Sequence, residues 1–356
     1  EETKDQEQIQ EENQIQEQNQ ISDDIDSRVE GLDESKWQLT ECFVLIFIFQ
    51  IFITIFCQTE IGVLTTPTDS LTYNMKHKHR GKCVIFDHKV FDSQLEYNPR
   101  EGTQEDVKKL HQCLRKYDFD VMAYHDFTYL DIYKTIGQRK YKLLNYIFKI
   151  DFLVANEDHS DNDCLVIAVL THGEEGDILC ARDSRYRLDM LVNAFTGQNC
   201  PSLAGKPKIF IIQACRGQKV DPGIKMKASF DLTDSSKDVT IPVHADFLMI
   251  YSTPPGKLSF LFYKIKFYFN LGYFAFRNIN EGSYLIKYLT EELDKNYHRQ
   301  RKLDLVTLLT IVNRRICIEF ESSTKNSKFH EKKQTICFTS MLTRLIYLVP
   351  KDIMNN

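Results

Sequence analysis

Pro207-Lys-Ile-Phe-Ile-Ile-Gln-Ala-Cys-Arg-Gly217 indicates the fold class more directly than any other segment of the 356-residue chain. Its part from Ile209 to Ala214 is a short, nearly continuous apolar run, typical of a buried strand in a parallel sheet. The run ends on Cys215, and the next two residues break the apolar pattern. Because ligands of open α/β sheets bind beyond the carboxyl ends of the strands, Cys215 is expected to face a substrate rather than the core.

A second buried strand is predicted upstream, in Cys164-Leu-Val-Ile-Ala-Val-Leu-Thr-His172-Gly173. It brings His172 to the point where the strand ends. If the two strands are neighbours, imidazole and thiol share one crevice, as nucleophilic catalysis by cysteine requires. The other nine cysteines are interpreted as small buried hydrophobic residues, the usual role of an isolated cysteine.

The residues around Cys215 also match a known signature. Gln213-Ala-Cys-Arg-Gly217 fits the pattern Q-A-C-[RQG]-G, and His172 lies 43 residues upstream, near the spacing of that signature. The chain therefore resembles a caspase, and specifically an insect-like executioner caspase, from about Tyr73 to Lys351. The same resemblance is carried by Asn74-Met-Lys-His-Lys-His-Arg-Gly81, Glu157-Asp-His-Ser-Asp161, Leu170-Thr-His-Gly-Glu-Glu-Gly176, Ile241-Pro-Val-His-Ala-Asp-Phe247 and Ser340-Met-Leu-Thr-Arg344.

The resemblance implies a catalytic mechanism. Cys215 is expected to be the nucleophile and His172 the general base and acid of a cysteine endopeptidase. The backbone carbonyl of Asn98 would orient the imidazole, and the N–H groups of Gly173 and Cys215 would form the oxyanion hole. A glycine at position 173 lets the backbone approach the developing negative charge.

The resemblance also implies a pocket for a substrate aspartate, lined by Arg100, Arg277 and Gln213. Arginine pairs a carboxylate bidentately, which lysine does not. Asn278 matches the family residue that contacts the fourth residue before the cut. Tyr273-Phe-Ala-Phe-Arg-Asn278 departs from the usual Tyr-Tyr-Ser-Trp-Arg-Asn, which alters the neighbouring subsites but leaves the expected requirement for aspartate.

The expected organisation is that of a zymogen. Residues 1–69 are interpreted as a disordered acidic propeptide, 70–217 as the large catalytic subunit, 218–240 as a processing linker and 241–356 as the small subunit. Asp231-Leu-Thr-Asp234 is the expected linker cut, and Asp26 and Asp69 are further candidates. The implied partners are protein substrates with an Asp-x-x-Asp-like site, an upstream initiator caspase and a second copy of the processed chain.

Composition narrows the remaining function classes. A formal net charge of −5 without a basic stripe argues against a nucleic-acid partner. The ten cysteines lack metal-ligand spacing, so no metal or other cofactor is expected. Together with the absence of a signal peptide, they favour the cytoplasm. The apolar block at 43–57 is shorter than the roughly 20 residues that span a bilayer, so a membrane anchor is only the alternative interpretation.

The pattern of apolar residues predicts an α/β fold, with three layers around a mostly parallel six-stranded sheet. Thr103 is expected to cap a helix from 103 to 114, whose apolar face contains Val107, Leu110 and Leu114. The other predicted elements are strands at 83–86, 247–251, 335–341 and 345–349 and helices at 284–293 and 303–320.

Three segments do not fit the family pattern: 43–57, 139–153 and 257–272. They are rich in residues with A/T-rich codons, so they are interpreted as translated introns, with genuine surface insertions as the alternative. The insertion before Arg277 also favours a rival function. In that hypothesis the chain is a catalytically impaired homologue that acts as a dimerisation partner or decoy.

Overall fold

The computed structural model describes residues 65–137, 154–216, 244–254, 275–323 and 327–351, and it gives the backbone course of 257–262 and 265–270. The chain divides into two units, 1–60 and 61–356, and all described residues belong to the second. The segments 43–57 and 139–153, the linker 218–240 and the candidate cuts at Asp26 and Asp234 lie outside the described residues.

A six-stranded sheet with the order β13-β8-β7-β3-β1-β2 forms the centre of this unit. All neighbouring strands are parallel except β13, which pairs antiparallel with β8. The mostly parallel six-stranded sheet predicted from the sequence is confirmed. Its strands are β1 Lys82–Asp87, β2 Asp120–His125, β3 Leu165–Leu170, β7 Lys208–Gln213, β8 Phe247–Tyr251 and β13 Cys337–Ser340.

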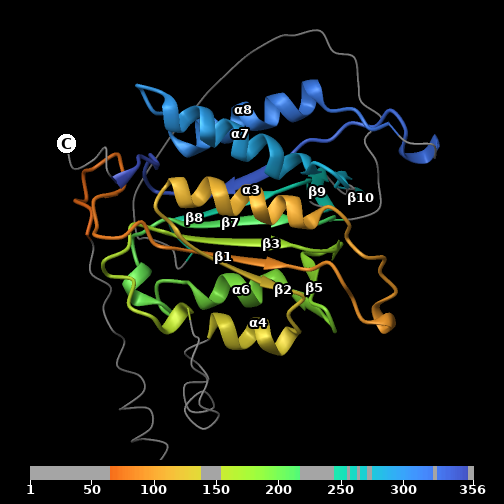
Figure 1. Ribbon diagram of the computed structural model, residues 1–356, viewed down its shortest axis with the longest axis horizontal. Helices are drawn as coiled ribbons and strands as arrows, with labels where there is room; N and C mark the ends of the chain where they lie inside the picture. Colours follow the sequence, from red (N-terminus) through yellow and green to blue (C-terminus); the bar gives the residue numbers. More distant parts are fainter. Residues whose placement is uncertain are drawn as a thin grey trace, which may run out of the picture. The chain divides into compact units, whose positions relative to one another are not determined.

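Helices cover both faces of the sheet, which gives the three layers expected (Figure 1). One face is covered by α3 Thr103–Lys116, α7 Tyr284–His298 and α8 Leu305–Glu319, and the other by α4 Tyr129–Ile136 and α6 Leu188–Ala194. Because side chains of a strand alternate between faces, β7 contributes to two cores. Ile209 and Ile211 pack with the first helix layer, and Phe210 and Ile212 pack on the opposite face.

The connections between strands explain why the site forms at one edge. The chain passes from β1 to β2 through α3 on one face of the sheet. It then passes from β2 to β3 through α4, and from β3 to β7 through α6, on the other face (Figure 1). The winding therefore changes face between β1 and β3, where α/β folds open a crevice. Leu170 of β3 pairs with Gln213 of β7, so His172 and Cys215 each lie two residues beyond paired strand ends.

Smaller elements surround this edge. A three-stranded sheet contains β4 Gly173–Glu174, β5 Ile178–Cys180 and β6 Arg185–Arg187, and a short hairpin contains β11 Arg277–Asn278 and β12 Gly282–Ser283. Within the insertion 257–272, β9 Lys257–Phe262 and β10 Ile265–Asn270 pair with each other. The 3₁₀ turns are η1 Ser93–Leu95, η3 Val154–Asn156, η4 Pro201–Leu203 and η5 Ser327–Phe329.

Two local predictions are wrong. Thr103 does not cap α3, because Gly102 is the N-cap residue and the Thr103 hydroxyl instead donates to the buried carboxylate of Asp87. The segment 345–349 is not a strand, since only an isolated bridge joins Leu345 to Thr72. The apolar face of α3 is confirmed: Val107, Leu110 and Leu114 are all buried.

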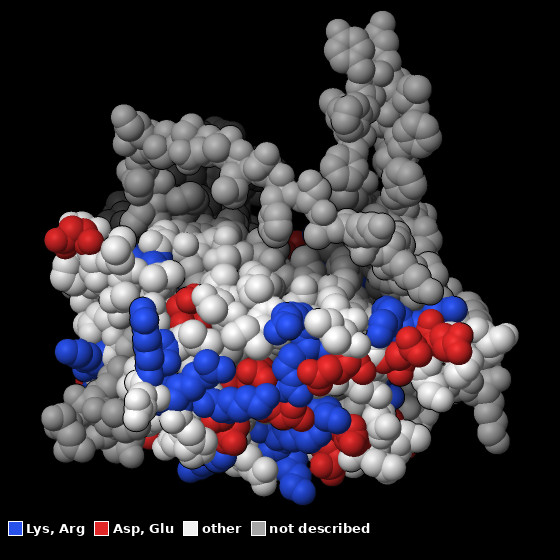
Figure 2. All heavy atoms as spheres, turned by 90° about the horizontal axis from the view of Figure 1, so that it is seen from above, with Lys and Arg blue, Asp and Glu red and all other residues white. Residues whose placement is uncertain are grey.

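Charged side chains of both signs mix on the face seen from the side of α7 and α8 (Figure 2). Several form ion pairs between helices. Lys116 of α3 contacts Asp294 of α7, and Arg315 of α8 contacts Glu291 and Glu292 of α7 at 2.8 Å and 3.0 Å. These pairs supplement the apolar packing beneath them, because exposed ion pairs contribute little alone.

No helix in the described part of the chain is long and apolar enough to cross a bilayer.

Candidate active site

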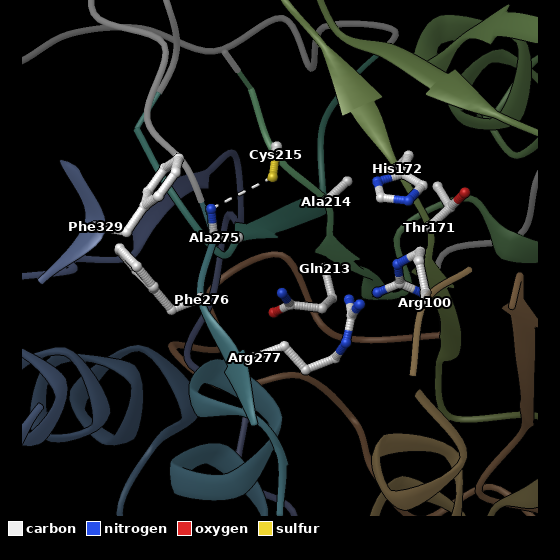
Figure 3. A pocket seen from close by; sticks show the side chains of 10 residues that line it. All are labelled: Arg100, Thr171, His172, Gln213, Ala214, Cys215, Ala275, Phe276, Arg277 and Phe329. Atoms are coloured by element: carbon white, nitrogen blue, oxygen red, sulfur yellow. Dashed lines mark hydrogen bonds between the residues drawn. The ribbon is translucent and has the colours of Figure 1, made fainter. Parts of the chain in front are cut away.

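His172 and Cys215 line one cavity of about 330 Å³ at the carboxyl edge of the sheet (Figure 3). Both side chains follow buried strands, so the core of the molecule sets their positions. The cavity is also lined by residues from the ends of β3 and β7, the β1–α3 connection, the segment around β11 and the loop before β13: Arg100, Thr171, Gln213, Ala214, Ala275, Phe276, Arg277 and Phe329.

The thiol of Cys215 is turned toward Ala275 (Figure 3). The backbone N–H of Ala275 donates to Sγ at 3.4 Å. Burial raises the pKa of the Cys215 thiol above its ordinary value, although this N–H and the charges of Arg100 and Arg277 act in the opposite direction. The thiol is therefore protonated at neutral pH in this arrangement.

The imidazole of His172 is held by a backbone group and by aromatic rings. Its Nε2 lies 3.0 Å from the carbonyl oxygen of Asn98, so Nε2 carries the proton that is donated. Burial, helped by the positive charges of Arg100 and Arg277, lowers the pKa of His172 to about 4. The ring is neutral at physiological pH, and its Nδ1 is left as the proton acceptor.

His172 and Cys215 thus form a neutral pair rather than an ion pair. No hydrogen bond joins the two side chains, since the contacts of these described residues go to Asn98 and Ala275. The side chain of the next residue, Arg216, forms an ion pair with Asp177, and its guanidinium carbon lies 3.9 Å from the centroid of the Tyr251 ring.

Two guanidinium groups and an amide meet in the deeper part of the cavity. Figure 3 shows the guanidinium ends of Arg100 and Arg277 turned toward each other, with the side chain of Gln213 beside them. Arg100 is 1% exposed, and its Nη1 donates to the carbonyl of His88 and to Thr103 Oγ1, both at 3.0 Å. Burial and the neighbouring Arg277 lower the pKa of Arg100 to about 9. Two neighbouring guanidinium groups that line the same cavity can bind a carboxylate.

Arg277 and Gln213 complete this part of the cavity. The Nε of Arg277 donates to the carbonyl of Glu101 at 2.7 Å, which joins β11 to the loop after Arg100. Burial lowers the pKa of Arg277, and nearby carboxylates raise it only partly. The Oε1 of Gln213 is buried and has no hydrogen-bond partner. A buried amide oxygen without a partner costs free energy, which a ligand recovers only if it donates an N–H or O–H to this oxygen.

Two other predicted site residues lie at the margin. Asn278 does not line the cavity, and its side-chain oxygen accepts N–H groups of Asn280 at 2.8 Å and Glu281 at 3.2 Å. Its contact with substrate stays a prediction. A Cβ at Gly173 would lie 2.4 Å from the carbonyl oxygen of Cys215, so only glycine allows this approach. The oxyanion hole stays a prediction as well.

Sequence reasoning missed Asp106, which joins the two halves of the arginine pocket. Its Oδ1 accepts from the backbone N–H of Ser283 at 2.7 Å and from its hydroxyl at 3.1 Å, and so connects α3 to the hairpin of Arg277. Burial raises the pKa of Asp106 to about 6. The available signal was an acidic residue directly before Val107, on the apolar face of the predicted helix.

The structure offers no metal centre in the residues it describes, where no three His, Cys, Asp or Glu side chains form a group that could hold an ion. The cysteines there are free thiols.

Comparisons with known proteins identify the family of this chain. A family model described as "Caspase domain" matches residues 80–347. Caspase drICE of Drosophila melanogaster is 39% identical over 297 residues, which cover 83% of this chain and 77% of drICE. Caspase-3 of Bos taurus is 36% identical over 276 residues, which cover 78% of this chain and 87% of that protein. The crystal structure of caspase-1 from Spodoptera frugiperda superimposes with a TM-score of 0.64 and 36% identity, covering 82% of this chain and 98% of that one. The chain therefore belongs to the caspase family of apoptotic cysteine endopeptidases.

Proposed function

We propose that this caspase cleaves protein chains after aspartate, with Cys215 as nucleophile and His172 as general base and acid. One observation carries the proposal. A thiol and a neutral imidazole share a cavity with the buried guanidinium of Arg100, the half-buried guanidinium of Arg277 and the amide of Gln213. The arginines would fix the substrate carboxylate, and the thiol would then lie beside the following peptide carbonyl.

The chemistry follows from the protonation states. With the Nε2–H of His172 bound to the Asn98 carbonyl, Nδ1 accepts the thiol proton as Sγ attacks the carbonyl carbon. The protonated imidazole then gives that proton to the departing amine, which leaves a thioester. Water, deprotonated by the same imidazole, hydrolyses the thioester and regenerates the thiol. N–H groups of Gly173 and Cys215 would stabilise the oxyanion in both steps.

The arginine pocket would supply selectivity for aspartate. A carboxylate can pair bidentately with guanidinium groups, whereas the isosteric asparagine would leave the buried Arg100 and the half-buried Arg277 without an anionic partner. Asp106 supports this pocket by holding the hairpin of Arg277 against α3. Asn278 would contact substrate further from the cut, from the short hairpin that carries Arg277.

We further propose that the uncut chain is a zymogen with subunits 70–217 and 241–356, activated by cleavage after Asp234 in the linker 218–240. The bond between Sγ of Cys215 and Ala275 N–H supports a resting state with a disengaged thiol. Asp69, a further candidate cut, lies exposed in a turn closed by Ser70 N–H and the Pro67 carbonyl. An initiator caspase in the reducing cytoplasm would make the first cut.

A homodimer of processed chains is part of the same proposal. The β13 strand is an edge of the central sheet, and its exposed residues Thr339 and Ser340 have no second strand beside them among the described residues. An open edge of this kind offers backbone groups to an identical strand.

The test is hydrolysis of fluorogenic tetrapeptides that end in Asp or Asn. We expect the processed wild-type chain to cleave only the Asp peptide, and Cys215→Ser to be inactive with unchanged circular dichroism. Equal cleavage of both peptides would contradict the arginine pocket. No cleavage of either peptide would favour the second candidate function, a decoy that dimerises with a working caspase. The β9–β10 insertion before Ala275 is the observation that favours that candidate.

A further inference from the structure

The imidazole of His172 contacts two aromatic rings, which also contact each other. Tyr97 stacks on it with a centroid distance of 4.7 Å and an interplanar angle of 16°. Phe91 contacts it at 4.9 Å and 51°, and Phe91 and Tyr97 meet edge to face at 5.7 Å. The nearly parallel stack covers one face of the imidazole and contributes to the burial that lowers its pKa.

Tyr97 is itself fixed by a polar network. Its hydroxyl donates to a carboxylate oxygen of Glu174, and the same oxygen accepts the Nε–H of Arg185 at 2.7 Å. The guanidinium of Arg185 also lies 5.4 Å from the centroid of the Tyr97 ring. Although burial acts to raise the pKa of Glu174, these two donors lower it overall, so the carboxylate stays ionised.

The three elements of this network all connect to His172. Glu174 lies two residues after it in β4, and Arg185 begins β6 of the same small sheet. Tyr97 directly precedes Asn98, whose carbonyl holds the imidazole Nε2. One dipeptide therefore supplies both a hydrogen bond in the plane of the ring and a surface against its face.

The two contacts restrain different motions. A single hydrogen bond to Nε2 leaves the imidazole free to rotate about the N···O direction. A stacked ring removes that rotation, since turning the imidazole would break the parallel contact. We propose that Tyr97, anchored by Glu174 and Arg185, is a positioning residue that fixes the plane of His172 so that Nδ1 can accept the thiol proton. This inference rests on the proposed function of His172.

The alternative is that Tyr97 only packs the small sheet. Phe91, Leu95 and Cys180 form a small buried cluster against which Tyr97 lies, so losing the ring would also loosen this region. The two roles differ in what they change. Loss of packing lowers the amount of folded enzyme, whereas loss of positioning lowers kcat and returns the pKa of His172 toward its ordinary value.

The test compares Tyr97→Ala, Tyr97→Phe and Glu174→Gln in the full chain, after processing, with Tyr129→Ala as a matched control. Tyr129 is a partly exposed tyrosine at the start of α4 that also contacts other aromatic rings, away from the cavity. We expect Tyr97→Ala to lower kcat roughly 10²-fold, as for a displaced catalytic group. KM should stay nearly constant, because the arginine pocket is untouched. Tyr97→Phe and Glu174→Gln keep the stack and should lose only a few-fold.

The second readout is the titration of His172, followed by the NMR signal of its ring in a Cys215→Ser background. We expect an apparent pKa near 4 with Tyr97 or Phe at position 97, and a pKa shifted toward 6.5 with Ala. This readout still tests the positioning role if wild-type protein cleaves no peptide. If Tyr97→Ala does not fold, Tyr97→Leu replaces it, since leucine keeps apolar packing without an aromatic face. Two outcomes would overturn the proposal. One is an unchanged kcat in Tyr97→Ala, or in Tyr97→Leu where it replaces it. The other is a loss of kcat no larger than that of Tyr129→Ala, with the pKa of His172 unchanged.

Discussion

The substitution Arg100→Lys tests the arginine pocket most directly. The side chain is 1% exposed, and its Nη1 already donates hydrogen bonds to the carbonyl oxygen of His88 and to Thr103 Oγ1. The remaining N–H groups are therefore the ones available to a substrate carboxylate. A lysine at this position cannot make the internal bonds and a bidentate pair together, because it has one nitrogen where arginine has three.

The magnitude follows from two effects. Breaking a buried charge pair costs about 2–5 kcal/mol, which lowers kcat/KM between about 30-fold and several thousand-fold. The pKa of Arg100 falls from 12.5 to about 9 through burial and Arg277. The same burial and the same neighbouring Arg277 would lower the pKa of a lysine at this position below its ordinary value of about 10.4. Since lysine loses its charge above its pKa, the remaining activity of the variant should fall toward alkaline pH.

The assay is kcat/KM on a tetrapeptide ending in Asp, measured from acid to alkaline pH beside the Asn peptide. Arg187→Lys is the matched control, because Arg187 is exposed on β6 and pairs with Asp189 at 2.9 Å. The control should behave as wild type. If Arg100→Lys loses less than about three-fold and still prefers Asp over Asn to the same degree, Arg100 does not bind the substrate carboxylate.

Three further outcomes are expected. Because burial raises the pKa of Cys215 above 9.0, the rate at which iodoacetamide alkylates Cys215 should keep rising with pH through 9. A rate that is already constant from acid pH upward would indicate a preformed thiolate and contradict this. Burial raises the pKa of Asp106 from 3.8 to about 6, so the folded state binds this proton more tightly than the unfolded chain. Relative to Asp106→Asn, the wild-type free energy of unfolding should therefore drop by about 3 kcal/mol as the pH rises from below about 3 to above about 7, and parallel curves in urea would contradict this. Mass spectrometry of activated protein should show a cut after Asp234, and an intact 218–240 linker would contradict that processing site.

Much of the fold could be predicted because its central strands can be recognised from their own residues, without knowledge of their neighbours. The apolar runs that became β3 and β7 are buried on both faces, as parallel strands must be. β2 was missed because five of its six residues are partly buried or exposed, at the edge of the sheet. The eight-residue helix α4 is too short for its periodicity to stand out.

The site residues could be predicted only where they belong to a recognisable sequence motif. Cys215 and His172 follow from their strands and signature, whereas Asp106 and Tyr97 act through partners far away in sequence. Asp106 reaches Ser283 across 177 residues, and Tyr97 reaches Glu174 across 77. The Thr103 hydroxyl failed as a cap for the same reason, since the buried carboxylate of Asp87 competes for it. Local patterns contain no information about such contacts.

The insertion 257–272 leads to the last prediction. Its strands β9 and β10 pair with each other in a hairpin, outside the central sheet. A hairpin closed on itself adds little to loop-closure cost, so removing it should leave the fold intact. The insertion ends three residues before Ala275, the residue whose N–H holds the thiol of Cys215. Its position therefore couples the insertion to the catalytic thiol.

Deletion of 257–272 should shorten the connection to Phe276 and Arg277 and free the thiol from Ala275. We expect faster alkylation of Cys215 and a kcat/KM on the Asp peptide raised by up to roughly 10²-fold, the cost of a misplaced reacting group. Exchanging 257–272 for a Gly-Ser linker of equal length is the control, since it keeps the length but not the hairpin. If the deleted chain is no more active and its thiol reacts no faster, the insertion does not restrain the site, and the contact with Ala275 belongs to the working enzyme.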